Sequence, residues 1–385
     1  MRVLFIEPYP TEGPSSRYRV EQYIPFLSDN NIVCMVRPFV SSKFYKILYK
    51  RGYYLEKILC FGLSCFRRFR DMLTALGCDI IFIHLEALPI GPPLLELFLA
   101  GIGKKIIYDL DDAIYLGRTS SANKFLRCLK WPLKIETIIR ISKHVITCNE
   151  YLAAYALAFN KNVTVMHTSV DTDKFRPNRY SIADLSKNRR YSSIDEKGAT
   201  IRYRNASDSD AVNIGWIGSH STAGFLEGIQ NVFYRLSRTH QFNLKIVGAG
   251  RRVEIPGVNI INTDWNLPDE INQFQSLDIG VYPLPDDRWT VGKTGFKTIQ
   301  YMSVGIPCVV SNIGANKDIV ENGRNGFLVD NEDEWVEKLS LLIENPDLRM
   351  KMGQCARLTA EERFSLKTSA PKYLYIIKAV AAGSN

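Results

Sequence analysis

The stretch that most constrains the fold is residues 292–311, GKTGFKTIQYMSVGIPCVVS, which predicts a helix followed directly by a buried strand. Phe296, Ile299 and Met302 recur at a spacing of three, which is typical of one apolar helical face. The segment 305–310 then supplies a Gly-x-Pro helix end and an apolar Cys-Val-Val run. A short, fully apolar strand of this kind is typical of the buried parallel sheets of α/β proteins.

The same stretch also predicts an anion site. Lys293, Lys297 and Gln300 fall at i, i+4 and i+7, so they are expected to share one helical face. Glycines at a helix start, the positive helix end and two lysines all favour a diphosphate there. An ordinary surface helix with two solvated lysines fits the same spacing.

Length and composition favour a soluble two-domain protein with anionic partners. The 385 residues exceed one ordinary core, and 46% of them are hydrophobic. The net charge of +9 suits nucleotide donors, phospholipid surfaces or nucleic acid. None of the eight cysteines forms a C-x-x-C pair, so we expect reduced thiols in a cytosolic protein. The five histidines are scattered, and we expect no metal site and no signal peptide.

Several acidic residues follow predicted strands of the first half. Residues 79–84 and 105–110 are apolar strand-like runs, and the second leads into Asp109, Asp111 and Asp112. Carboxylates at the carboxyl ends of parallel strands point into the crevice where α/β proteins bind ligands. Alternatively, these acids cap the helix that follows.

Residues 37–70 hold nine Lys and Arg against one Glu, interleaved with nine aromatic residues. This pattern predicts docking on an anionic membrane surface. A solvated basic face would look the same. Nucleic acid is not expected, because no DNA-binding or RNA-binding signature accompanies the charges.

Three segments resemble the GT-B glycosyltransferases of family 4. Residues 300–308 match the family's donor-binding run, residues 318–329 match its Glu-Ile-Val-x-x-Gly-x-x-Gly-x-Leu-Val pattern, and residues 168–177 resemble its crossing segment. Gly292 and Gln300 stand where the signature has two Glu. The resemblance implies an α/β chain of the GT-B fold, with two Rossmann-like domains facing a central cleft.

The domain boundaries follow from these matches. We expect an N-terminal acceptor-binding Rossmann-like domain at 1–177 and a polar linker or insertion at 178–211. A nucleotide-sugar-binding Rossmann-like domain is expected at 212–365, and residues 366–385 are expected to cross back to the first domain.

The resemblance further implies a retaining, metal-independent glycosyltransferase that needs no cofactor. It would move a sugar from a nucleotide-sugar donor to a glycan or lipid-linked acceptor in cell-surface polysaccharide synthesis, in the cytoplasm or on the inner face of the cell membrane. A non-catalytic sugar-nucleotide or polyanion binding scaffold is the alternative. A GT-B sugar-nucleotide epimerase would need a pair of acids such as Asp286 and Asp287.

The candidate site residues fall into three groups by expected role. In many family members a strand-end His lies near the reacting sugar, and Asp111 occupies that slot. Most family members have an Arg at the position of Ser219, and that Arg clamps the diphosphate. Lys293 and Lys297 are therefore expected to supply the missing positive charge. The catalytic candidates are Asp111 and Asp112, the donor-binding candidates are Gly13, Ser219, Lys293, Lys297 and Gln300, and the acceptor-side candidates are Ser15, Ser16, Arg17 and His84.

Overall fold

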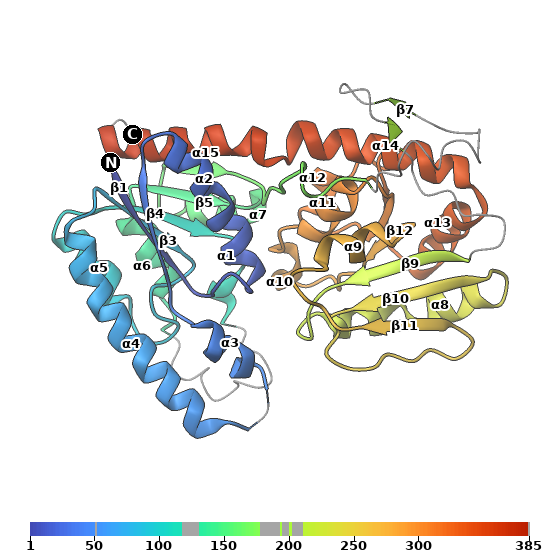
Figure 1. The fold of residues 1–385 in the computed structure, drawn as a ribbon, viewed down its shortest axis with the longest axis horizontal. Helices are drawn as coiled ribbons and strands as arrows, with labels where there is room; N and C mark the ends of the chain where they lie inside the picture. The colour runs from blue at the N-terminus through green and yellow to red at the C-terminus, as the bar shows by residue number, and fades with distance from the viewer. Residues whose placement is uncertain (51, 118–130, 178–192, 195–199, 202–210, 384–385) are drawn as a thin grey trace. The chain divides into compact units, whose positions relative to one another are not determined.

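The chain folds into two compact α/β units (Figure 1). The computed structural model describes residues 1–50, 52–117, 131–177, 193–194, 200–201 and 211–383. Unit 1 comprises Met1–Ser169, Val291–Thr294 and Leu366–Asn385, and unit 2 comprises Val170–Thr290 and Gly295–Ser365.

Unit 1 is built on a parallel six-stranded sheet of order β2-β1-β3-β4-β5-β6. The apolar runs read from the sequence form its buried central strands, whereas β2 is a half-buried edge strand. The strand order reverses between β1 and β3, which makes their carboxyl ends the expected ligand crevice. The strands are β1 (Arg2–Glu7), β2 (Val33–Pro38), β3 (Ile80–His84), β4 (Lys105–Leu110), β5 (His144–Thr147) and β6 (Val163–Val165).

Helices cover this sheet, and the C-terminal helix α15 completes its core. Tyr373 of α15 stacks on Tyr23 with ring centroids 4.2 Å apart and also contacts Phe82 of β3. The helices of unit 1 are α1 (Pro14–Arg19), α2 (Ile24–Asp29), α3 (Ser42–Leu48), α4 (Tyr54–Leu76), α5 (Leu94–Gly101), α6 (Lys134–Ile141), α7 (Glu150–Leu157) and α15 (Leu366–Ala382), with 3-10 turns η1 (Glu21–Tyr23) and η2 (Ile114–Leu116).

Unit 2 contains a second parallel six-stranded sheet of order β11-β10-β9-β12-β13-β14. Its order reverses between β9 and β12, as in dinucleotide-binding folds. The strands are β9 (Val212–Ile217), β10 (Phe242–Val247), β11 (Asn259–Thr263), β12 (Ile279–Tyr282), β13 (Cys308–Ser311) and β14 (Phe327–Val329); a separate antiparallel pair joins β7 (Ser193–Ile194) to β8 (Thr200–Ile201).

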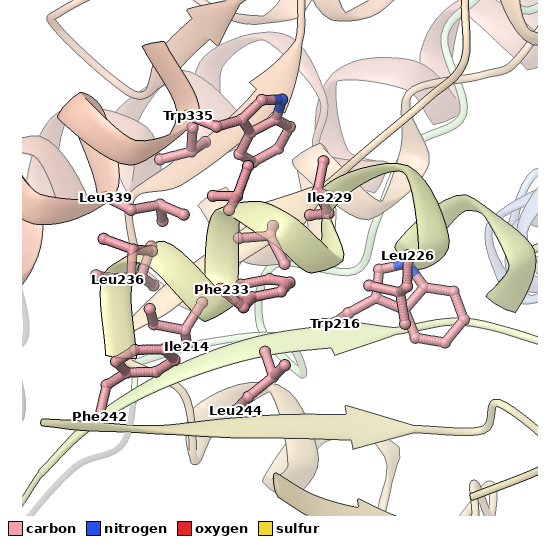
Figure 2. Close-up of a cluster of buried hydrophobic side chains, with 14 of the residues drawn as sticks. Ile214, Trp216, Leu226, Ile229, Phe233, Leu236, Phe242, Leu244, Trp335 and Leu339 are labelled. Carbon is pink, nitrogen blue, oxygen red and sulfur yellow. The ribbon is translucent and has the colours of Figure 1, made fainter. Parts of the chain in front are cut away.

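The core of unit 2 lies between this sheet and its helices (Figure 2). Phe233 of α8 packs over Ile214 and Leu244 of the sheet, and Trp335 of α13 closes the same cluster. The helices are α8 (Gln230–Ser237), α9 (Glu270–Gln275), α10 (Arg288–Val291), α11 (Phe296–Ser303), α12 (Asn316–Ile319), α13 (Glu332–Glu344) and α14 (Pro346–Arg363), with a 3-10 turn η5 (Ala223–Ile229). The predicted α/β architecture with two Rossmann-like domains is confirmed.

The chain passes from unit 1 to unit 2 between Ser169 and Val170, whereas the sequence places the boundary at 177. The Val170 N–H donates to the Phe364 carbonyl (2.9 Å), and Arg357 donates to the Thr172 carbonyl (2.8 Å), so these residues pack with unit 2. Most of the predicted linker at 178–211 lies outside the described residues. The C-terminal 366–385 segment belongs to unit 1.

Candidate functional site

Three ionisable residues form one row at the carboxyl edge of the unit 1 sheet. Ile83 of β3 pairs with Ile6 of β1, so Glu7 follows in register with His84. His84 in turn pairs with Asp109 of β4. Residues in register on parallel strands project to the same face, so the row lies beside the β1–β3 switch point.

A buried arginine anchors one end of this row. Arg19 of α1 donates from Nε to Asp109 Oδ2 (3.0 Å) and from its terminal nitrogen to the Met166 carbonyl (2.7 Å). The His84 Nδ1 atom lies 2.8 Å from Asp109 Oδ2. Burial alone would raise the pKa of Asp109, but Arg19 and His84 outweigh it and lower the pKa below its ordinary value. Asp109 is therefore held as a carboxylate that orients the His84 ring.

The second ring nitrogen of His84, Nε2, points toward the Asp111 carboxylate. His84 Nε2 lies 3.9 Å from Asp111 Oδ1, and neither atom has a hydrogen-bond partner among the described residues. Burial would lower the pKa of His84, but the Asp111 and Asp109 carboxylates outweigh it and raise the pKa. Burial also raises the pKa of Asp111. The gap is too long for a direct hydrogen bond, so each atom keeps an unused hydrogen-bonding position.

Asp112, the second catalytic candidate, has a different environment. Its Oδ1 accepts from the N–H of Ala113, and its Oδ2 lies 2.9 Å from Lys293 Nζ. The 291–294 segment clusters with unit 1, where the Asn149 side chain also donates to the Lys293 carbonyl (3.1 Å). Asp112 therefore combines a turn-capping role with an ion pair.

Glu7 is a site residue that the sequence analysis missed. Neither of its carboxyl oxygens has a hydrogen-bond partner among the described residues, and the side chain is buried. Burial, reinforced by Glu21, raises the pKa of Glu7 to about 8, although His84 and Arg68 act against the shift. At pH 7 the carboxyl group is mainly protonated and can both donate and accept. Its place directly after an apolar strand was the available sequence signal.

The Glu7→Gln variant should be more stable than wild type at alkaline pH. Because the folded-state pKa of Glu7 is raised, wild type loses stability as pH rises from about 4.5 to about 8. Glutamine has the shape of the protonated acid and never ionises. We expect a difference of up to about 5 kcal/mol above pH 8, because each pKa unit corresponds to about 1.4 kcal/mol, and relaxation of the folded state lowers this figure.

Thermal melting of both proteins from about pH 5 to pH 9 measures this difference. The gap in melting temperature should widen with pH and vanish near the acidic end. Glu56→Gln, which removes an exposed carboxylate from α4, should show a flat difference. A flat difference for Glu7→Gln as well would contradict the raised pKa.

Four candidate site residues lie at the N-cap or within α1: Gly13, Ser15, Ser16 and Arg17. A Cβ atom on Gly13 would lie 2.4 Å from the Tyr9 Cβ, so no side chain fits there. Ser16 is buried, and its Oγ accepts from the Tyr9 N–H (3.3 Å). Arg17 donates to the Thr11 carbonyl (2.9 Å), and Ser15 is half-buried. Gly13 and Ser16 thus shape this loop, and their predicted ligand contacts stay predictions.

A pocket of about 230 Å³ opens beside the segments that follow β3 and β4. Aromatic and charged side chains share its wall, and Lys134 Nζ lies 3.6 Å from Glu86 Oε1. Its lining residues are Glu86, Pro89, Gly91, Ile114, Tyr115, Leu116, Gly117, Trp131, Pro132, Lys134 and Ile135.

Two glycine turns meet at the carboxyl edge of the unit 2 sheet. Gly218 follows β9, and Gly248 follows β10 with φ +76°. A Cβ atom on Gly248 would lie 2.4 Å from the Gly218 carbonyl oxygen. The two turns therefore pack backbone to backbone, and no side chain fits between them at Gly248. Ser219 is exposed here, with its Oγ 2.9 Å from Ser221 Oγ.

Lys297 lies beside the β9–β12 switch point, in the first turn of α11. Its Nζ is 4.8 Å from the ring centroid of Tyr282, which ends β12, and 5.9 Å from that of Trp216 in β9. The aromatic faces attract the ammonium and hold it at the carboxyl edge of the sheet. The donor-binding role predicted for Lys297 stays a prediction.

The expectation that Lys293, Lys297 and Gln300 share one helical face is wrong. Helix α11 begins at Phe296, because Gly295 takes the left-handed conformation (φ 65°) that interrupts the helix. Lys293 lies before this break, in unit 1, and Gln300 is buried within α11. The roles predicted for the three residues stay predictions.

The described part of the chain contains neither a metal-binding cluster nor a helix suited to span a membrane. No group of three or more His, Cys, Asp or Glu side chains there is arranged to hold a metal ion. Within the same part of the chain, no helix has the combined length and apolarity needed to span a membrane.

Residues 211–345 match the family model for glycosyl transferases group 1. An uncharacterized glycosyltransferase of Haemophilus influenzae is 33% identical over 132 residues, which is 31% of this chain and 36% of the relative. The capsular polysaccharide biosynthesis glycosyltransferase CapM of Staphylococcus aureus is 24% identical over 41% of this chain and 43% of the relative. The chain thus matches less than half the length of these relatives.

Solved structures resemble the whole chain at low sequence identity. A glycosyltransferase from Rickettsia africae has a TM-score of 0.63 at 17% identity and covers 98% of both chains. Anabaena HepE in complex with UDP-glucose has a TM-score of 0.63 at 15% identity, over 98% of this chain and all of that one. The predicted GT-B fold is therefore confirmed, and similarity to group 1 glycosyltransferases is shown for residues 211–345.

Proposed function

We propose that this protein is a retaining, metal-independent glycosyltransferase that takes a sugar from a nucleotide-sugar donor. The observation that carries the proposal is the match of residues 211–345 to group 1 glycosyltransferases, because it falls on unit 2 and its switch-point turns. HepE was solved with UDP and with UDP-glucose, which makes a uridine diphosphate sugar the first donor to test.

Unit 2 binds the donor in this proposal. The packed turns at Gly218 and Gly248 present main-chain groups, and Lys297 supplies positive charge for the diphosphate. That charge matters most as the diphosphate departs, because negative charge develops on the leaving group. The departing phosphate accepts the proton of the acceptor hydroxyl on the same face of the sugar, which gives retention.

Unit 1 binds the acceptor. Asp111 Oδ1 and His84 Nε2 are oriented toward each other, and each can hydrogen-bond an acceptor hydroxyl. Glu7, protonated at pH 7, adds a donor at the same sheet edge. The neighbouring pocket, with Tyr115, Trp131 and the Lys134–Glu86 pair, offers the polar and aromatic mix that a glycan or lipid-linked sugar requires. The similarity to CapM, a capsular polysaccharide biosynthesis glycosyltransferase, supports a place in cell-surface polysaccharide synthesis.

A panel of nucleoside diphosphates tests the donor half. One of them should raise the melting temperature by about 5 °C when present at about 100 times its dissociation constant. The matching nucleotide sugar should then be hydrolysed slowly without acceptor, in the presence of a chelator. No stabilisation by any nucleoside diphosphate would contradict donor binding, and loss of hydrolysis with chelator would contradict metal independence.

A non-catalytic sugar-nucleotide or polyanion binding scaffold is the second candidate. It is favoured by Gly292 and Gln300, which replace the two acids of the resembled signature. A scaffold would be stabilised by the same ligand without hydrolysis or transfer. The epimerase alternative is disfavoured, since Asp287 Oδ1 accepts from the N–H groups of Trp289 (2.9 Å) and Thr290 (3.0 Å) and so caps α10.

A further inference from the structure

Helix α4 departs from the usual amphipathic pattern, because polar side chains are buried on it while large apolar ones are exposed. Its buried residues are Ser64, Arg68 and Asp71 together with the apolar Met72 and Ala75. The Arg68 guanidinium donates to the carbonyls of Ala87 (2.9 Å) and Glu7 (3.1 Å) and to Asp71 (3.3 Å). Arg68 and Asp71 are therefore directed toward the protein.

The exposed side of α4 is an apolar stripe. Its large side chains recur every three or four residues along 23 residues, a length of about 34 Å. Phe66 is 70% exposed and Leu55 78%. We define the α4 stripe as Leu55, Ile58, Leu59, Leu63, Phe66, Phe69, Leu73 and Leu76.

Helix α5 extends this apolar surface, because it packs against α4 (Figure 1). Leu94, Leu97, Phe98 and Ile102 are exposed on and just after it. Together the two helices expose on the order of 1,000 Å² of apolar side chain, more than the few hundred Å² found on most soluble monomers. An exposed apolar surface of this size marks a binding site for a partner or a membrane.

The charges around the α4 stripe select an anionic one. Lys46, Lys57, Arg67 and Arg70 lie on α3 and α4, while Glu56 is the one exposed acid of these two helices. The other acid, Asp71, is already paired with Arg68 and Arg37.

A second copy of this chain would also fit the spacing of the α4 stripe. Its flanking side chains would then set basic residues against basic residues. Coiled-coil partners require opposite charges at those places, so a second copy is disfavoured. An anionic bilayer attracts the same residues and accepts an apolar stripe in any register.

We propose that α4 and α5 lie in the plane of an anionic lipid bilayer, with the α4 stripe inserted among the acyl chains. The aromatic and basic residues of 37–70 predict membrane docking from sequence alone. The structure changes the residues responsible, because Phe39 and Phe44 are buried in the protein while the α4 stripe is exposed. The proposal stands apart from the proposed catalysis.

Flotation of the full-length protein with lipid vesicles tests it. We expect binding to phosphatidylcholine vesicles that contain phosphatidylglycerol, weakened by salt, and about tenfold weaker binding to pure phosphatidylcholine. The triple variant Leu59→Ser, Phe66→Ser and Leu73→Ser should lose about tenfold or more of the anionic binding. Because these side chains are exposed, its melting temperature should not fall.

Matched controls separate insertion from general stickiness. Leu157→Ser, Leu358→Ser and Tyr375→Ser remove three equally exposed apolar groups from α7, α14 and α15, and should bind like wild type. Arg70→Gln with Lys46→Gln should weaken anionic binding and flatten its salt dependence. If the triple serine variant does not fold, the single replacements are scored in the same way.

Three outcomes would overturn the proposal. The first is equal binding of the triple serine variant and wild type. The second is equal binding to neutral and anionic vesicles. The third has three parts: wild type forms a stable dimer by light scattering, the triple serine variant is monomeric, and wild type does not bind vesicles. The second copy would then be the occupant of the α4 stripe.

Discussion

Asp111→Asn is expected to lower sugar transfer about 100-fold or more while donor affinity stays within about twofold of wild type. Asp111 belongs to unit 1, whereas Lys297 and the Gly218 and Gly248 turns, which are proposed to bind the donor, belong to unit 2. Its Oδ1 faces His84 Nε2 across 3.9 Å in a buried environment, where a lost charge has a large effect. Asparagine keeps the volume but removes the negative charge that orients the acceptor or stabilises the cationic sugar.

Two measurements separate this role from a structural one. Steady-state kinetics with the identified donor should show a lower turnover number, and the equilibrium affinity for the nucleoside diphosphate should not change. The Asp111 carboxylate raises the pKa of His84, so an NMR titration should show that His84 loses its proton at a lower pH in the variant. Asp29→Asn, on the exposed end of α2, is the matched control. Collapsed donor affinity with surviving turnover would contradict the assignment.

The central strands could be read from the sequence because local apolar runs determine them. β4 and β9 are such runs, bounded by charged or glycine-rich turns. The bounds of α13 and α14 were also predictable, since Asn331 and Asn345 cap them with side-chain oxygens. The edge strand β11 could not be read in this way, because three of the five residues of its sequence, NIINT, are polar and most are exposed.

The candidate site depends on pairings that no local pattern reveals. Arg19 and Asp109 are 90 positions apart, and their ion pair exists only because α1 packs beside β4. Glu7 and His84 come together through parallel strand register. Asp111 and Asp112 were predictable as strand-end acids, but their different partners were not. The tertiary contacts of Asp111 and Asp112 determine the different role of each carboxylate.

Lys297→Ala is expected to lower turnover about 100-fold and to weaken donor binding as well. The ammonium is held at the β9–β12 switch point over Tyr282 and Trp216. The resembled family places an Arg and a Lys near the Gly218 turn, where this chain has Ser219 and so no full positive charge. A diphosphate leaving group needs such charge more in the transition state than in the ground state.

Lys297→Arg should restore part of the activity, because it returns the charge with a different geometry. Lys351→Ala removes an exposed lysine from α14 in the same unit and should leave turnover unchanged. Kinetics and nucleotide titrations of the three variants make the comparison. Wild-type turnover in Lys297→Ala would return this lysine to a structural contact with the aromatic rings.

Lys293→Ala should lower turnover more than it weakens donor binding. A double-mutant cycle with Asp112→Asn separates two possible causes of this loss. Lys293 pairs with Asp112 at 2.9 Å, so its removal also leaves that carboxylate without its cation. If Lys293 only neutralises Asp112, its removal has no further effect in the Asp112→Asn background. If Lys293 supplies charge to the diphosphate, turnover falls again there. We expect the second result, and wild-type turnover in Lys293→Ala/Lys297→Ala would contradict a diphosphate role for both lysines.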